Sequence, residues 1–225
     1  FSVDEAGFNR YMDEQRRKAR ESWKGMEGAG ASQDLYKSLV ASGLKTGFVG
    51  YHMEEISSRV LYIIKDGKGV ETAFDGDIVE IITADTPFYG ESGGQVGDTG
   101  AIVGKGFSIA VTDTKKPVND LITHVCRVDA GSVSVGDEAE LVPDMERRDA
   151  TRRNHTATHI LHAILRKRIG EHVRQAGSLV EPTGFRFDFN HFEAIGAETL
   201  RTIEEEANRA VLKNIEVSTD VLSFD

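Results

Sequence analysis

Short runs of β-branched and aromatic residues fill the middle of the chain from Gly47 to Leu141, and glycine or Asp-Gly turns separate many of them. Such runs are typical of strands, and half a dozen of them favour a small barrel or sandwich. The predicted strands cover residues 48–51, 60–64, 78–83, 107–112, 121–128 and 139–141. The pattern ends near Pro143-Asp144, where we expect a boundary.

Helical periodicity flanks this β-rich stretch. Before it, Ser2-Val3-Asp4-Glu5 has the pattern of a capping box and predicts a helix over about residues 4–24, with a shorter helical piece near 33–41. After it, apolar residues at helical spacing predict helices over about 147–170 and 197–214.

A hairpin, which begins with the stretch Gly177-Ser178-Leu179-Val180, and a last strand are expected in the last third of the chain. Aromatic and charged residues alternate from Phe185 to Phe189, which predicts a half-buried strand with Phe185, Phe187 and Phe189 inward. The β-branched stretch over 215–222 predicts a last strand. The whole pattern predicts an α+β fold. Its expected units are a helical linker in residues 1–45, a glycine-rich β-barrel-like unit in 46–145 and an α/β layer in 146–225.

Composition excludes several classes of protein. Hydrophobic and charged contents of 39% and 28% are ordinary for a globular chain. The sequence has no run of eighteen apolar residues and no signal segment, so we expect no membrane span. A single cysteine, Cys126, excludes an internal disulfide and suits a reducing compartment. The start at Phe1 and the stop after the last expected strand suggest a piece of a longer protein.

Charge is distributed unevenly. The net charge of −10 argues against nucleic-acid binding through bulk charge, yet residues 147–174 carry eight Arg or Lys against Asp149 and Glu171. This basic band is either a solvated helix face or a set of phosphate contacts. The candidates for RNA contact are Arg152, Arg153, Arg166, Lys167 and Arg168.

Two histidines four residues apart give the sharpest chemical signal. At about 100° per residue, His155 and His159 lie side by side on one helix face, with His162 near them and away from the aliphatic residues. Such a pair can share one metal ion, whereas the alternative is a pair of structural histidines. A zinc protease would carry Glu after the first histidine, and Thr156 stands there instead.

A second special segment, Pro87 to Gly100, is rich in glycine. Glycine permits positive φ and close backbone approach to a ligand, but a wide hairpin loop has the same composition. The segment lacks the Lys and Ser/Thr of a phosphate-binding P-loop.

Taken in order, these motifs resemble one family. They are Phe88-Tyr89 with Glu91-Ser92-Gly93-Gly94-Gln95 and Asp98-x-Gly100, then Arg153-Asn154-His155-Thr156-Ala157-Thr158-His159, Gln175-x-Gly177-Ser178 and Arg186-Phe187-Asp188-Phe189. Together they resemble the editing region of alanyl-tRNA synthetases and the freestanding alanyl-tRNA editing proteins. The resemblance spans nearly the whole chain and makes residues 146–225 the editing core.

The resemblance implies hydrolysis of tRNA(Ala) mischarged with serine or glycine, in the cytoplasm. It places Gln175 near the seryl group and Gly93, Gly94 and Gln95 beside the site. It also implies that His155 and His159 bind zinc together with a later Cys-x-x-x-His motif. This sequence has no such motif, because Ala130 stands four residues after Cys126. We therefore expect a partial zinc site and low activity.

The partners implied are the acceptor end of tRNA(Ala) and the remaining domains of a parent synthetase. ATP would serve alanine ligation in that parent and not in these residues. Two alternatives stay open: a noncatalytic tRNA-docking module with structural histidines, and an editing domain of the threonyl-tRNA synthetase type. The glycine-rich segment and the β unit before the histidines argue against the second.

Overall fold

The structure is a computed structural model that describes Tyr11 and residues 29–218. The helix predicted over 4–24 therefore lies, apart from Tyr11, outside the described residues.

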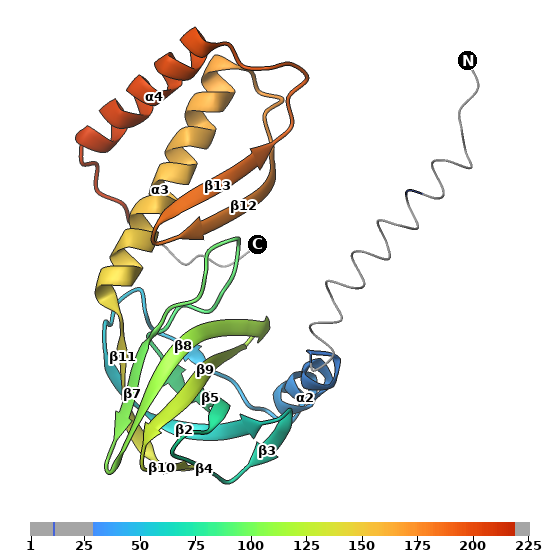
Figure 1. Cartoon of the computed structure of the whole chain (residues 1–225), viewed down its shortest axis with the longest axis vertical. Helices are drawn as coiled ribbons and strands as arrows, with labels where there is room; N and C mark the ends of the chain where they lie inside the picture. The colour runs from blue at the N-terminus through green and yellow to red at the C-terminus, as the bar shows by residue number, and fades with distance from the viewer. Residues whose placement is uncertain (1–10, 12–28, 219–225) are drawn as a thin grey trace.

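A closed antiparallel barrel forms the lower body of the molecule (Figure 1). Its strands follow the order β11-β7-β8-β9-β5-β2, and β2 pairs back with β11 through Leu141 and Ile56. The bounds are β2 Ile56–Lys65, β5 Ile78–Thr83, β7 Gly100–Gly104, β8 Phe107–Val118, β9 Leu121–Ala130 and β11 Glu138–Pro143. The predicted α+β fold with a small barrel is thus confirmed.

Several short strands were not predicted. They are β3 Lys68–Val70, β4 Thr72–Phe74, β6 Asp85–Thr86 and β10 Ser132–Ser134, and the barrel strand β7 was missed as well. Each is too short or too polar to stand out as a hydrophobic run. The strand predicted over 48–51 was wrong beyond its first residue: β1 covers only Gly47–Phe48, because the chain turns where the N–H groups of His52 and Met53 both donate to the Val49 carbonyl.

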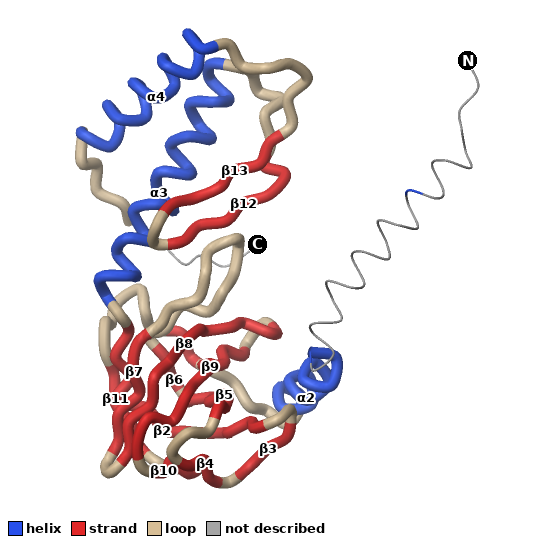
Figure 2. Tube along the Cα trace, viewed as in Figure 1, coloured by secondary structure: helices blue, strands red, loops and turns tan. Residues whose placement is uncertain are grey.

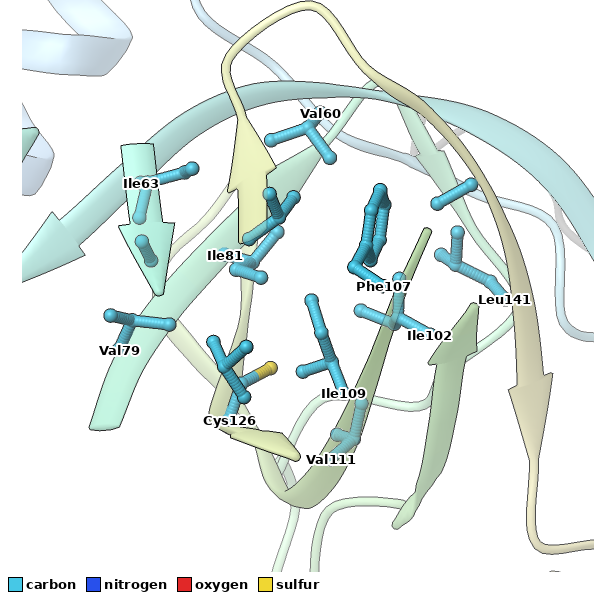
Figure 3. Packing of buried hydrophobic residues seen from close by; sticks show 14 of the residues in the cluster. Val60, Ile63, Val79, Ile81, Ile102, Phe107, Ile109, Val111, Cys126 and Leu141 are labelled. Carbon is cyan, nitrogen blue, oxygen red and sulfur yellow. The ribbon is translucent and has the colours of Figure 1, made fainter. Parts of the chain in front are cut away.

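The barrel interior is an aliphatic core, shown in Figure 3. Alternate residues of β8 point inward, so that Phe107, Ile109 and Val111 are buried. Ile63 and Leu141 face them from β2 and β11. Full burial of one such side chain contributes about 1.5–3 kcal/mol, so this cluster stabilises the barrel.

One histidine lies in the barrel without solvent contact. His124 donates from Nδ1 to the Ile81 carbonyl at 2.8 Å, and its Nε2 accepts from Thr86 Oγ1 at 2.8 Å. Thr86 Oγ1 in turn accepts from the Phe88 N–H at 3.0 Å. Burial lowers the pKa of His124 to about 4, so the ring is neutral at neutral pH.

Helix α2, Ala29–Ala41, begins four residues before the predicted Gln33 and packs on the outside of the barrel, where it contacts β8 (Figure 1). Tyr36 and Leu39 lie against Ile64, Ile82 and Leu121. The Tyr36 hydroxyl donates to Glu80, and burial together with that carboxylate raises the Tyr36 pKa.

Helix α3, Met145–Arg168, leads from the barrel into a second layer, where it packs with β12 Gln175–Glu181, β13 Gly184–Phe189 and α4 Ala197–Leu212 (Figure 2). Asp144 caps α3 by accepting the Arg147 N–H. The change from strand to helix falls between Pro143 and Met145, while the division into three units stays a prediction.

The second layer has its own core, in which Ile164, Leu165, Val173 and Ile203 are buried. Two predictions fail in this layer. Phe185 does not point inward but is 36% exposed, because only Phe187 and Phe189 of β13 reach the core.

The strand predicted over 215–222 is absent from its described part, residues 215–218. Ile215 and Val217 are 70% and 67% exposed there. The β-branched pattern is present, but no neighbouring strand pairs with these four residues in the structure.

Candidate functional site

The glycine-rich segment forms a tight turn that projects from the barrel toward the second layer, in green in Figure 1. Ser92 and Gln95 exchange backbone hydrogen bonds of 3.2 and 3.0 Å across this turn. Gly93 and Gly94 both have positive φ, +60° and +84°. Two successive residues of this kind define the turn, and glycine adopts the conformation without steric cost. The segment is therefore a hairpin-like turn.

The turn docks on strand β12. The Val180 N–H donates to the Gly94 carbonyl at 2.7 Å, and the Val96 N–H donates to the Val180 carbonyl at 3.1 Å. A Cβ atom on Gly94 would lie 2.6 Å from the backbone oxygen of Ser178. Only glycine permits this approach, so the turn serves as a close contact between the barrel and β12. We call residues Ser92–Gln95 the glycine turn.

Docking brings Gln95 to the histidine helix. The Gln95 side chain is buried, and its Oε1 lies 2.6 Å from His155 Nδ1. The amide oxygen can only accept, so Nδ1 carries the proton and Nε2 keeps its lone pair. The ring centroids of His155 and His159 are 5.0 Å apart. Burial first, and the neighbouring His159 second, lower the pKa of His155, which favours the neutral ring.

A buried ion pair holds the ends of the loop on the start of α3. Arg148 donates to Asp98 Oδ2 from Nε at 2.9 Å and from Nη2 at 2.5 Å, and the two side chains are 7% and 3% exposed. Asp98 Oδ2 also accepts the Tyr89 N–H at 2.7 Å, and Arg148 Nη2 donates to the Pro87 carbonyl. This network fixes both flanks of the glycine turn relative to α3.

The hairpin of β12 and β13 is also hydrogen-bonded to α3, next to His155. Asn154 donates from its side-chain amide to the Glu181 and Pro182 carbonyls at 2.8 and 3.2 Å. Asn154 precedes His155, so this contact helps to set where the histidine stands against β12. Sequence reasoning missed the roles of Asn154, Asp98 and Arg148. For Asn154 and Asp98, the available signal was their place in the family motifs. For Arg148, it was the nearness of Asp144, the residue that caps α3.

The histidines offer half of a zinc site. Their ring centroids lie 5.0 Å apart, and a hydrogen bond donated by the second ring nitrogen, as from His155 to Gln95, is usual for a metal-binding histidine. Protein zinc sites have three or four protein ligands, however. In the described part of the chain, no three His, Cys, Asp or Glu side chains are grouped so as to hold a metal. The residues present do not complete a zinc site, and Cys126 is buried inside the barrel.

The structure places Gln175 away from the glycine turn. Gln175 begins β12 and pairs with Phe189, whereas Gln95 pairs with Val180 near the other end of that strand. Five strand positions span roughly 16 Å. The residues predicted from sequence therefore lie near opposite ends of β12. Gln95 and His155 are near one end, and Gln175 is at the other.

His162 also departs from the prediction. Its ring packs on Phe187 with centroids 5.0 Å apart, and its Nε2 lies 3.4 Å from the Val173 carbonyl. His162 is thus partly buried against the hairpin of β12 and β13, whereas His159 is exposed.

The basic band is not one continuous face. Arg148 is buried, and Lys167 and Arg168 both pair with Glu206 of α4. Arg152 is exposed and lies 3.4 Å from Asp149, and Arg153 and Arg166 are exposed as well. Internal pairing therefore uses part of the charge that the sequence counted as surface.

Comparison with known proteins gives the family. Residues 1–147 match the family of tRNA synthetases class II (A). Since the match covers more than half of the chain, the chain belongs to this family. The match ends at the beginning of α3.

The relatives extend the likeness through the histidine helix. The alanine–tRNA ligase of Anaeromyxobacter dehalogenans is 48% identical over 225 residues, which is all of this chain and 24% of the relative. The alanine–tRNA ligase of Carboxydothermus hydrogenoformans is 47% identical over the same length, 26% of that protein. That of Mesorhizobium japonicum is 44% identical over 224 residues, 25% of its length. The chain thus spans about a quarter of these relatives.

Within the described residues, no helix combines the length and the apolar character needed to cross a membrane.

Proposed function

We propose that this chain is the editing unit of an alanine–tRNA ligase and hydrolyses the ester of tRNA(Ala) mischarged with serine or glycine. The observation that carries the proposal is the contact between Gln95 of the glycine turn and His155, in a chain whose relatives are alanine–tRNA ligases. A pocket built for alanine rejects smaller or nearly isosteric amino acids poorly, so a separate hydrolytic site has a chemical reason.

In the proposed reaction, a water oxygen attacks the carbonyl carbon of the aminoacyl ester. The bond between that carbon and the ribose oxygen then breaks, and the ribose oxygen takes a proton, which releases the amino acid and the tRNA. Gln95 holds the proton of His155 on Nδ1, so in the metal-free chain the Nε2 lone pair can accept a hydrogen bond or a proton from the water, whereas bound zinc would occupy that lone pair. The Asp98–Arg148 pair positions the glycine turn for this contact.

Zinc enters the proposal as a weakly held ion. Two imidazoles supply half of the usual protein shell, so His155 and His159 should lose zinc to a chelator unless further ligands join them. Metal analysis after dialysis against a chelator tests this, with a longer form carrying a Cys-x-x-x-His motif as the matched comparison. We expect stoichiometric zinc only in the longer form. A stoichiometric, chelator-resistant ion in the present chain contradicts the proposal.

The proposal includes the partners that the family suggests. These are the acceptor end of tRNA(Ala) and the other domains of a parent ligase, where ATP-dependent alanine ligation takes place, in the cytoplasm. Exposed Arg152, Arg153 and Arg166 support contacts with RNA phosphates. Lys167 and Arg168 contribute less because Glu206 pairs with both.

A deacylation assay tests the function. We expect the chain to release serine from seryl-tRNA(Ala) faster than buffer does and to leave alanyl-tRNA(Ala) intact. The longer form with the Cys-x-x-x-His motif should act faster. Equal rates on both aminoacyl-tRNAs contradict editing specificity, and no hydrolysis by either form contradicts the enzymatic proposal.

A further inference from the structure

Three aromatic rings meet at the Gln175 end of the hairpin, outside the groups described so far. His172 comes from the loop before β12, and His191 and Phe192 follow β13. His172 Nε2 lies 2.9 Å from His191 Nδ1, with ring centroids 5.1 Å apart and ring planes inclined by 18°. Because the two nitrogens are close while the ring centres are far apart, the imidazoles cannot be stacked face to face. They lie edge to edge in nearly one plane.

Phe192 covers this imidazole pair. Its ring centroid is 5.0 Å from that of His172 and 4.7 Å from that of His191, at interplanar angles of 29° and 38°. These distances are too short for edge-to-edge contact in one plane, so the phenyl ring overlaps the faces of both imidazoles. We call His172, His191 and Phe192 the ring platform.

The ring platform is open to solvent. Phe192 is 81% exposed, which leaves the phenyl face turned away from the imidazoles available to a ligand. The hydrogen bond between the imidazoles joins the loop before β12 to the residues after β13, which carry the phenyl ring.

The surroundings favour a flat, unpaired ring over a phosphate. Arg174 is exposed beside the platform, but Glu171 and Glu193 are exposed there too, so the local charge attracts no anion strongly. Gln175 pairs with Phe189 at this end of the hairpin and supplies amide groups that can bond a base edge. Unpaired RNA bases stack on exposed aromatic side chains in this manner.

We propose that the ring platform stacks on an unpaired base of an RNA strand, with Phe192 as the contact surface. The inference rests on the proposed function, because tRNA presents unpaired bases next to the aminoacyl ester. A base held at this end of β12 lies near Gln175, and the nucleotides after it would run along the hairpin toward His155.

Fluorescence titration with a short single-stranded RNA tests the proposal. The RNA carries 2-aminopurine a few nucleotides before its 3′ end and no amino acid, so binding is measured apart from hydrolysis. We expect the chain to quench the fluorophore and Phe192→Ala to raise Kd by about 5- to 150-fold, the effect of one lost base stack. Phe192→Trp should retain binding. The matched control is Phe185→Ala, which removes a 36% exposed phenyl ring from the other end of β13 and should leave Kd unchanged.

Further arms separate this inference from the editing proposal. An RNA that lacks the base at the 2-aminopurine position should bind the unsubstituted chain and Phe192→Ala equally. His155→Ala should bind the fluorescent RNA normally; a chain that binds it through Phe192 but hydrolyses no ester contradicts editing and supports the ring platform. The inference is overturned if the unsubstituted chain binds no RNA, or if Phe192→Ala binds the RNA with the Kd of the unsubstituted chain. It is also overturned if Phe185→Ala raises Kd as much as Phe192→Ala does.

Discussion

Gln95 is the residue through which the barrel reaches the histidine helix. Its side chain is buried and its oxygen lies 2.6 Å from His155 Nδ1. A buried N–H left without a partner costs about 1–3 kcal/mol, so the amide stabilises one tautomer of His155 as well as the docking of the turn.

Replacing this amide should separate acceptor chemistry from packing. We expect Gln95→Leu to slow seryl-tRNA(Ala) hydrolysis by about 10- to 100-fold, as for other partners that orient a functional histidine. Gln95→Glu keeps an acceptor and should retain more activity. Nitrogen NMR of the His155 ring provides a readout that packing alone would not move: Gln95→Leu should shift the tautomer populations, and unchanged ring signals would refute the assignment.

His124 gives a prediction about stability at acid pH. Burial lowers its folded pKa to about 4 from an ordinary value of 6.5. Between these values the unfolded chain binds a proton that the folded chain does not, so the contribution is complete above pH 6.5 and is lost as pH falls toward 4. The full effect is roughly 3 kcal/mol.

Urea unfolding at a series of pH values measures this effect. The unsubstituted chain should lose free energy of unfolding as pH falls from 6.5 to 4, beyond the loss from its carboxylates. His124→Gln should be less stable at pH 7 but should show a shallower loss over the same range. Parallel curves for the two proteins would mean that His124 does not carry the dependence.

At the scale of elements, the glycine turn is held by backbone geometry and the loop flanks by the Asp98–Arg148 pair. The sequence predicted the helix that carries the two histidines and a glycine-rich segment, because both signals are local. It could not predict which strand the segment meets, because the contacts of Gly94 with β12 join residues far apart in the chain. Phe185 shows the same limit: alternation predicts two faces of a strand but not how far the core extends beneath them.

Neighbouring glycines in the turn make a matched pair. Gly94→Ala should destabilise the docked turn by about 2 kcal/mol or more, since its Cβ meets the Ser178 backbone and its φ is +84°. In Gly93→Ala the added Cβ has no neighbour within 4 Å, so only its φ of +60° should lower the stability of the turn, by about 1 kcal/mol. Amide hydrogen exchange at Val180, whose N–H bonds to Gly94, reports the docking directly; equal exchange in the two variants would argue against it.

The buried ion pair predicts a different pattern. Asp98→Ala leaves the Arg148 guanidinium buried without its carboxylate and should cost about 3–5 kcal/mol in urea unfolding. The double variant Asp98→Ala/Arg148→Met removes both charges and should be more stable than the single variant. A double variant at least as unstable as Asp98→Ala alone would show that the pair does not couple the loop to α3.

At the scale of the whole molecule, the barrel and the second layer meet where Gln95 contacts His155, and α3 connects them (Figure 1). The histidine spacing was readable from sequence, but the separation of Gln175 from this contact along β12 was not, because it depends on how the hairpin lies against α3. The proposed site therefore extends along the hairpin from the glycine turn to Gln175 and the ring platform.

The rate of seryl-tRNA(Ala) hydrolysis by His155→Ala, compared with the unsubstituted chain at an equal folded fraction, tests the central claim most directly. If the contact of Gln95 with His155 belongs to a hydrolytic site, the rate should fall by about 100-fold or more, since loss of an outer partner alone costs 10- to 100-fold. A variant that loses stability but hydrolyses seryl-tRNA(Ala) at the unsubstituted rate would contradict the claim and would make the histidines structural parts of a tRNA-docking module.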